Sequence, residues 1–240
     1  MTVLLAFDTA GERMTIALQQ GGRRWSRAAA GGAKASAALV PEILGLLAEA
    51  GLGLGDLDAI AFGRGPGAFT GLRTACSVAQ GLAFGAGKPV LPIDSLLALA
   101  EDARSGASEF RVWAAIDARM NQIYAAEYAF ADDRWSTIAA PMLTDCGALG
   151  ARWRDAPPQA VAGDALLAFA AQLETGDARR FPDARTSADA LLALAERAWR
   201  DGAGVDPALA LPLYVRDKVA QTTREREAAR AAQTAAAGSP

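Results

Sequence analysis

Apolar runs bounded by turn residues open the chain and predict a strand meander. Residues 3–7 form a short apolar run that ends at Asp8, and a second run at 14–18 follows a turn. Short runs of this kind, flanked by glycine and polar residues, are typical of buried strands. The pair Gly21-Gly22 predicts a hairpin into a third strand near Trp25. We therefore expect three consecutive antiparallel strands, with an aspartate at the end of the first.

The same pattern restarts in the second half of the chain. Residues 111–116 form an apolar run that ends at Asp117, and a turn leads into a second run at 123–128. A third strand is expected at about 135–139. Two openings of one design indicate a weak internal repeat, in which each half carries an aspartate at the end of an equivalent strand.

A β-loop-α-β unit lies between these two openings. It consists of an apolar strand at 59–62, a glycine-rich loop at 63–67, a helix from Thr70 to about Gly85, and a strand at 89–93. Crossovers of this type are nearly always parallel and right-handed. The hydroxyl of Thr70 is expected to cap the helix.

Helical periodicity predicts the remaining helices. A helix with one apolar face follows the first meander, and Pro41 implies either a kink or a late start. The face of that helix consists of Leu39, Ile43, Leu46, Leu47 and Ala50. Further helices are expected at 96–103, 165–174 and 188–200, with short strands at 159–162 and 213–215.

The domain organisation follows from these patterns and from one polar stretch. Residues 104–109 are the best linker candidate, since they are polar and separate the two openings. We expect an N-terminal lobe at 1–103, completed by part of 186–219, and a C-terminal lobe at 110–185. Residues 220–240 alternate charge with alanine, which predicts a frayed helix or a disordered tail.

The glycine loop has two interpretations. Gly65 and Gly67 can adopt positive φ and let backbone N–H groups approach an anion at the start of the following helix. The spacing matches neither a P-loop nor the dinucleotide-binding fingerprint. The alternative is a tight strand-to-helix turn that binds nothing.

The two strand-end aspartates also leave two alternatives. If the lobes face each other, Asp8 and Asp117 line one cleft and hold Mg²⁺ with a nucleotide, because magnesium prefers carboxylate and phosphate oxygens. Alternatively, each aspartate caps its own turn.

Small residues follow one stripe of the central helix. Ser77, Gly81 and Gly85 recur every four residues, so they share a face on which another helix can approach closely. Val78 and Leu82 form an adjacent apolar stripe that suits the core. This helix is therefore expected to contact its own sheet on one side and a second chain on the other.

The amino-acid composition argues against several classes of function. The chain has no histidine, which excludes histidine-based triads and histidine metal sites. Its net charge of −3 argues against strong nucleic-acid binding by the chain alone. Cys76 and Cys146 follow no metal-binding pattern and are expected to be reduced and buried. With no apparent signal peptide or membrane span, we expect a cytoplasmic location.

Several blocks resemble one protein family. The segment GRGPGAFTGLR at 63–73, followed by AQGLAFG at 79–85, is similar to the signature of the bacterial TsaB family, also called YeaZ. The segments LLAFDTA, IDARMNQIY and PLYVRDKVA resemble further blocks of that family in the same order. The resemblance covers about residues 1–220.

This resemblance implies a two-lobed α/β fold of the actin-like, Hsp70-like (RNase H-like) type, with a mixed sheet in each lobe. It implies a non-catalytic subunit in the formation of threonylcarbamoyladenosine beside the anticodon of tRNA. The implied partners are a catalytic TsaD-like paralogue and a TsaE-like ATPase, with a homodimer when the chain is alone and tRNA reached only through the complex. ATP and a metal ion are expected on the partner subunits, and no cofactor on this chain.

In this interpretation two helices form the pairing surface, and no residue of the chain is catalytic. The expected interface residues are Leu39, Ile43, Thr70, Arg73, Thr74, Ser77, Gly81 and Gly85. The alternative is an autonomous nucleotide-hydrolysing or kinase-like enzyme of the same fold, for which Asp8, Gly65, Gly67 and Asp117 are the candidate nucleotide-binding residues.

Overall fold

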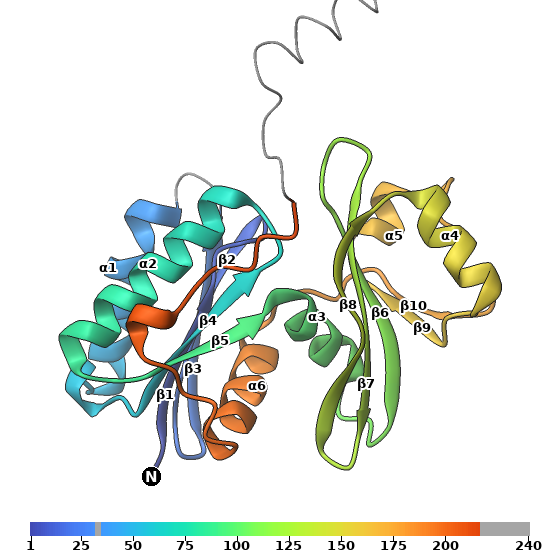
Figure 1. Ribbon diagram of the computed structural model, residues 1–240. Helices are drawn as coiled ribbons and strands as arrows, with labels where there is room; N and C mark the ends of the chain where they lie inside the picture. The colour runs from blue at the N-terminus through green and yellow to red at the C-terminus, as the bar shows by residue number, and fades with distance from the viewer. Residues whose placement is uncertain (32–34, 217–240) are drawn as a thin grey trace, which may run out of the picture.

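Two five-stranded sheets form the two lobes of the protein (Figure 1). The computed structural model describes residues 1–31 and 35–216. The predicted tail at 220–240 lies outside the described residues.

The first sheet has the strand order β3-β2-β1-β4-β5. Its first three strands pair antiparallel as a meander, and β4 and β5 add parallel to β1. The strands are β1 Val3–Asp8, β2 Arg13–Gln20, β3 Arg23–Ala30, β4 Ala59–Gly65 and β5 Val90–Asp94. These strands confirm the predicted opening meander and the parallel β-loop-α-β unit.

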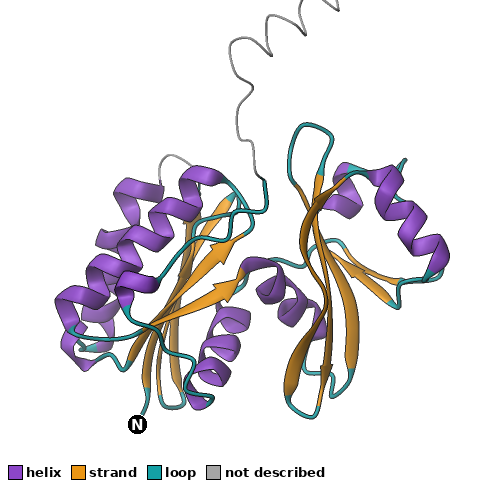
Figure 2. Ribbon diagram, viewed as in Figure 1, coloured by secondary structure: helices purple, strands orange, loops and turns teal. Residues whose placement is uncertain are grey.

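Helices cover both faces of the first sheet, which gives three layers (Figure 2). On one face, α1 (Ala35–Ala50) and α2 (Phe69–Ala86) enclose the first core cluster with the 3₁₀ turn η2 (Leu54–Asp56). On the other face, α6 (Ala188–Arg200) packs against β1 and β2 through its apolar stripe. Val90 also bridges Val205, which brings the chain after α6 to the free edge of β5.

The second sheet repeats this topology, with the order β10-β9-β6-β7-β8. Three antiparallel strands are followed by two parallel ones. The strands are β6 Phe110–Asp117, β7 Ile123–Ala131, β8 Arg134–Thr144, β9 Ala160–Ala162 and β10 Arg179–Phe181. The repeat of the opening design is therefore confirmed, as is the α/β fold with a mixed sheet in each lobe.

Helices also cover both faces of the second sheet. The outer face of the second sheet is covered by α4 (Cys146–Asp155) and α5 (Ala165–Ala168). Its inner face packs against α3 (Ser95–Arg104), which lies between the sheets in Figure 1. Leu96 and Leu99 join the core of the second lobe, while Ala98 joins that of the first. No described helix is long and apolar enough to cross a membrane.

Several local predictions are corrected by the structure. The predicted helix at 165–174 ends at Ala168, and residues 213–215 form no strand, although the Leu213 amide donates to the Arg64 carbonyl at 2.7 Å. The first helix begins at Ala35, so Pro41 lies inside it and the late start is wrong. Ala68, not Thr70, is the N-cap residue of α2. The strand β10 had no distinguishable sequence signal.

Candidate functional site

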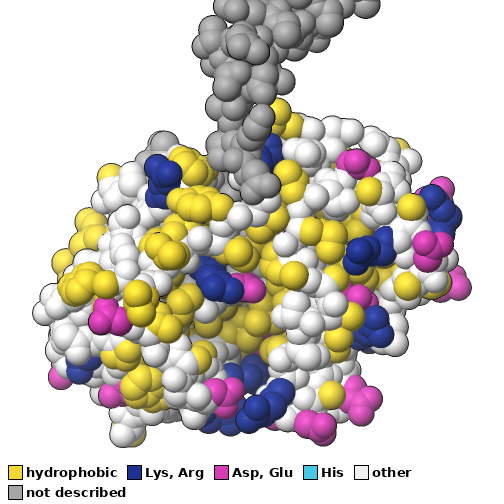
Figure 3. All heavy atoms as spheres, in the orientation of Figure 1, with side chains coloured by type: hydrophobic (Ala, Val, Ile, Leu, Met, Phe, Trp, Pro, Cys, Tyr) yellow, Lys and Arg dark blue, Asp and Glu magenta, His cyan; other side chains and the backbone are white. Residues whose placement is uncertain are grey.

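A cleft of about 1160 Å³ separates the two lobes (Figure 3). Its walls come from the β1–β2 turn, the glycine loop and the start of α2 in the first lobe, and from the β6–β7 turn and α5 in the second. Both strand-end aspartates lie on its lining. Of the residues that the sequence singled out for nucleotide binding, Asp8, Gly67 and Asp117 therefore line one cleft, whereas Gly65 is buried and is not part of its lining.

Asp8 is enclosed by its own chain. Its side chain is only 2% exposed, and both carboxylate oxygens accept hydrogen bonds, from the Ala10 amide at 2.5 Å and the Ser95 hydroxyl at 2.6 Å. Burial raises the pKa of Asp8, and these hydrogen bonds oppose that rise. A Cβ atom on Gly63 would lie 1.8 Å from the Asp8 carboxylate, so β4 leaves room for this side chain. The arrangement corresponds to the turn-capping alternative.

Asp117 lies at the end of β6 and binds the turn that follows it. Its carboxylate accepts hydrogen bonds from the Arg119 amide at 2.7 Å and the Arg119 guanidinium at 3.1 Å. Arg119 also donates to Glu12 of the first lobe at 2.9 Å, so this guanidinium bridges the cleft. The Asp117 amide donates to Asp164 at 2.9 Å.

The carboxylate of Asp164 is partly desolvated on the same wall. Burial raises its pKa, and the negative charges of Asp117 and Glu12 act in the same direction. Among residues 1–31 and 35–216, no group of three histidine, cysteine, aspartate or glutamate side chains could hold a metal ion.

The glycine loop packs against the β1–β2 turn. A Cβ atom on Gly71 would lie 2.0 Å from the Thr9 carbonyl oxygen, and one on Gly67 would lie 2.7 Å from the Ala10 Cβ. The Ala68 amide donates to the Ala10 carbonyl at 2.9 Å. Gly65 has φ +110°, a conformation that glycine adopts without strain. The loop thus has the geometry expected of the tight strand-to-helix turn.

The outer face of α2 is exposed and consists mainly of small, uncharged residues. Thr70, Arg73, Ser77, Gly81 and Gly85 are exposed, and Thr74 is partly so. The core face of the helix consists of Leu72, Ala75, Cys76, Ala79 and Ala83. Val78 and Leu82 only border the core, because close packing on the sheet favours the smaller alanines.

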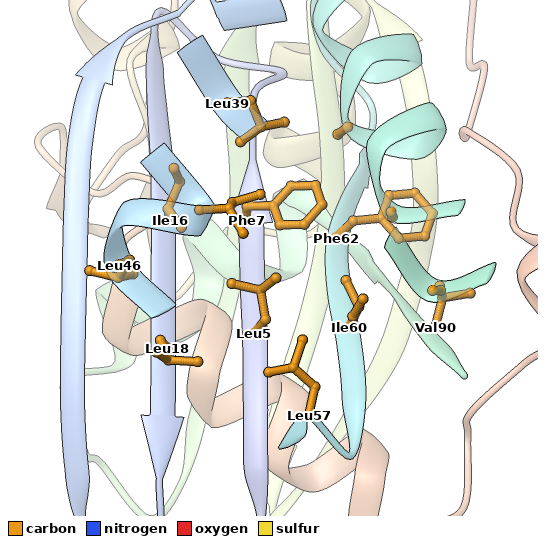
Figure 4. Packing of buried hydrophobic residues seen from close by; sticks show 14 of the residues in the cluster. Leu5, Phe7, Ile16, Leu18, Leu39, Leu46, Leu57, Ile60, Phe62 and Val90 are labelled. Atoms are coloured by element: carbon orange, nitrogen blue, oxygen red, sulfur yellow. The ribbon is translucent and has the colours of Figure 1, made fainter. Parts of the chain in front are cut away.

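Two of the predicted interface residues lie in the core and not on the surface. Leu39 and Ile43 are fully buried in the first core cluster, and Figure 4 shows Leu39 beside Phe7. They therefore cannot reach a partner, because α1 uses them to pack on the sheet. The exposed side of α1 instead carries Pro41 and Leu44. The helix α1 itself lies next to α2 (Figure 1).

The sequence patterns missed a segment that runs along α2. We call residues 207–216 the strap; it begins with the 3₁₀ turn η3 (Pro207–Leu209). The amide of Gln80 donates to the carbonyls of Pro207 and Ala210, both at 3.1 Å. Contacts across some 130 residues leave no local signal in a sequence, although the block PLYVRDKVA marked the region.

The chain is similar to proteins of tRNA modification. A family model described as "TsaD: tRNA N6-adenosine threonylcarbamoyltransferase" matches residues 32–165. The tRNA threonylcarbamoyladenosine biosynthesis protein TsaB of Haemophilus influenzae is 46% identical over 121 residues, which are 50% of this chain and 51% of that protein. The TsaB protein of Escherichia coli is 39% identical over 125 residues, 52% of this chain and 54% of that protein. The chain thus matches about half the length of these curated relatives.

Solved structures match over a longer stretch. The structure of YeaZ from Pseudomonas aeruginosa superposes with a TM-score of 0.77 and 34% identity, over 89% of this chain and all of that one. A second Pseudomonas aeruginosa structure, of a protein with similarity to YeaZ, gives a TM-score of 0.81 and 36% identity, over 90% of this chain and all of that one.

Proposed function

The chain belongs to the TsaD family, in its TsaB (YeaZ) branch, and from this premise we propose that it is a non-catalytic partner subunit in threonylcarbamoyladenosine formation. It pairs in the cytoplasm with a catalytic TsaD-like paralogue, and a TsaE-like ATPase joins the assembly. ATP and the metal ion are bound by those partner subunits, and tRNA is reached through the complex.

The observation that carries this proposal is the outer face of α1 and α2, which we call the pairing face. Its exposed members on α2 are Ser77, Gly81 and Gly85, and a Cβ atom added at Gly81 or Gly85 would meet nothing within 4 Å. Large apolar side chains are also exposed on these two helices: Phe84 of α2 is 61% exposed and Leu44 of α1 46%. Small residues beside exposed apolar ones suit close helix packing by a second chain.

The size of the cleft favours a second candidate, an autonomous nucleotide-hydrolysing enzyme. The state of Asp8 argues against it, because its carboxylate is buried and each of its oxygens already accepts a hydrogen bond from within the chain. The residues that follow the glycine loop are likewise engaged, because the Gly71 carbonyl accepts from the Thr9 hydroxyl and the Ala68 amide donates to the Ala10 carbonyl. The geometry of the pairing face and of Asp8 therefore favours the pairing role over the nucleotide-hydrolysing enzyme.

Reconstitution tests the proposed function directly. The full chain is purified with the TsaD-like paralogue of the same genome, and co-elution on a sizing column is followed by tRNA threonylcarbamoylation with the TsaE-like ATPase, ATP and threonylcarbamoyl-AMP. We expect co-elution and activity that requires this chain. Absence of association, together with ATP hydrolysis by the chain alone that Asp8→Ala abolishes, would establish the second candidate instead.

Gly81→Leu tests the position of the pairing face. The leucine has space in the free chain, so the fold should be retained, but it separates the packed helices. We expect the affinity for the paralogue to fall at least about tenfold, which corresponds to ~1.4 kcal/mol. Isothermal titration calorimetry measures this change.

The matched control is Ala148→Leu, which adds the same side chain to an exposed position on α4 of the second lobe. It should bind like the wild type. If Gly81→Leu also binds like the wild type, the pairing face lies elsewhere on the molecule.

A further inference from the structure

Arg73 is held in one orientation by two aromatic rings. Its guanidinium carbon lies 3.9 Å from the centroid of the Phe69 ring and 6.0 Å from that of Tyr214. Its Nε donates to the Tyr214 hydroxyl at 3.1 Å, and the two rings are 5.6 Å apart. Tyr214 belongs to the strap, whose backbone is fixed to β4 by the hydrogen bond from Leu213 to Arg64. The strap and α2 therefore orient this guanidinium together.

The charge of Arg73 has no counterion within the described part of the chain. Arginines elsewhere form ion pairs, such as Arg64 with Asp94 and Arg104 with Glu101, whereas Arg73 forms none. With Nε used by Tyr214, the two terminal nitrogens remain as an exposed fork of donors. A planar fork of this kind binds a carboxylate through two parallel hydrogen bonds.

Arg73 lies on the helix stripe that forms the pairing face. Arg73 precedes Ser77, Gly81 and Gly85 at successive spacings of four, so all four share one stripe of α2. It is also the only charged residue between Phe69 and Ala86. Oriented arginine and tyrosine side chains are frequent anchors of binding energy at protein interfaces.

The charges on the pairing face distinguish a different chain from a second copy. The carboxylates of α1 are Glu42 and Glu49, and both bind Arg27, at 2.8 and 3.1 Å. The helix α2 has no acidic residue. A second copy docked through the same two helices therefore brings no unengaged carboxylate to Arg73, whereas a different chain can supply one.

We propose that Arg73 is the charged anchor of the pairing face: it binds a carboxylate of the TsaD-like paralogue and favours pairing with that chain over self-pairing. The inference rests on the proposed function, because that function names the chain that covers the face. The inference specifies the chemistry of the contact. An acidic side chain of the partner binds Arg73, which the strap already orients in the free chain.

The test compares Arg73→Met and Arg73→Lys with the wild type by calorimetric titration of the paralogue at low and high salt. Arg73→Met keeps the aliphatic stem and removes the fork, and we expect a tenfold or greater loss of affinity and a weaker salt dependence. Arg73→Lys keeps the positive charge but not the planar fork of donors, so it should lose only part of the affinity. Tyr214→Phe removes the acceptor of Nε and should also lose part of the affinity.

The matched control is Arg23→Met. Arg23 stacks on Trp25 at 4.9 Å, on the strand β3, so this variant removes a similar stacked arginine from another surface. It should bind the paralogue like the wild type. Circular dichroism and sedimentation equilibrium establish the fold and the self-association of every variant, and Arg73→Met should self-associate like the wild type.

Each unfavourable outcome overturns a distinct statement. If the wild type binds the paralogue and Arg73→Met binds equally well, Arg73 is not an anchor. If Arg73→Met weakens self-association and hetero-association by the same factor, the preference for a different chain is wrong. If the wild type does not bind the paralogue at all, the proposed function is wrong, and the paralogue is not the partner that Arg73 binds.

Discussion

At the scale of single residues, the burial of the Asp8 carboxylate depends on the absence of a neighbouring side chain. The absence of a side chain on Gly63 makes room for its carboxylate, and Ser95 and Ala10 supply the hydrogen bonds that make its burial tolerable. The Ser95 hydroxyl in turn accepts from the Gly65 amide at 3.2 Å. The aspartate thus joins the ends of β1 and β4 to the start of α3.

Asp8→Asn should change how stability depends on pH. The pKa of Asp8 is raised above its ordinary value of 3.8, so the folded state favours the protonated form. As pH rises through the raised pKa, the wild type should therefore lose free energy of unfolding relative to the variant, which carries no charge there. Urea unfolding from about pH 3 to about pH 8 measures both curves. Parallel curves would show that Asp8 ionises equally easily in both states.

At the scale of elements, the glycines of α2 serve opposite purposes. Gly71 faces inward, where the helix backbone approaches the Thr9 carbonyl too closely for any side chain. Gly81 faces outward and has open space around it. One glycine therefore positions the helix on its sheet, while the other keeps the exposed face flat.

Alanine substitutions should separate these two roles. Gly71→Ala should destabilise the fold by about 1–3 kcal/mol, because its Cβ would meet the Thr9 backbone oxygen at 2.0 Å. Gly81→Ala should stabilise the free chain by about 0.5–1 kcal/mol, since alanine favours helix and meets no neighbour. Denaturant unfolding measures both, and equal effects at the two sites would contradict this assignment.

At the scale of the whole molecule, a buried charge network joins the lobes on the side away from the cleft. Glu101 on α3 accepts hydrogen bonds from Arg104 at 2.8 Å, Trp135 of β8 at 2.8 Å and Arg197 of α6 at 3.2 Å. Arg197 continues to Asp133 in the β7–β8 turn at 3.4 Å. This network fixes α6 and the β7–β8 hairpin to the helix between the two sheets.

Glu101→Gln should destabilise the protein by about 3 kcal/mol near neutral pH, because it leaves the poorly exposed Arg104 without a counterion and Arg197 with Asp133 alone. Burial alone would raise the pKa of Glu101, but the hydrogen bonds and positive charges outweigh it and lower that pKa. The stabilisation is therefore present above the ordinary value of 4.5 and is lost as pH falls through the lowered pKa.

The control for this variant is Glu12→Gln. Glu12 pairs with Arg119 across the cleft, but both side chains are highly exposed, so its loss should cost less than about 1 kcal/mol. Urea unfolding of both variants at several pH values makes the comparison. If both variants lose the same stability, the buried network does not hold the lobes together.

Short-range patterns were sufficient for most of the strands and helices. Apolar runs that end at Asp8 and Asp117 predicted the repeated meanders, and the periodicity of residues 188–200 predicted α6, because both are properties of neighbouring residues. The spacing of Ser77, Gly81 and Gly85 also predicted an exposed stripe on α2. The three-residue strand β9 was predicted because it is apolar and buried, whereas β10 begins with two exposed arginines and has no apolar run to distinguish it from loop.

The sequence by itself determined the two-lobed design, the repeated strand-end aspartates and the small-residue stripe. Only the tertiary structure decided what these features contact. Leu39 and Ile43 are core residues because α1 turns that face to the sheet, and Asp8 is enclosed because Gly63 and Ser95 meet it from distant segments. The strap reaches Arg73 across 141 residues of chain. Such contacts depend on how the elements pack, and packing brings together residues whose spacing along the chain carries no period.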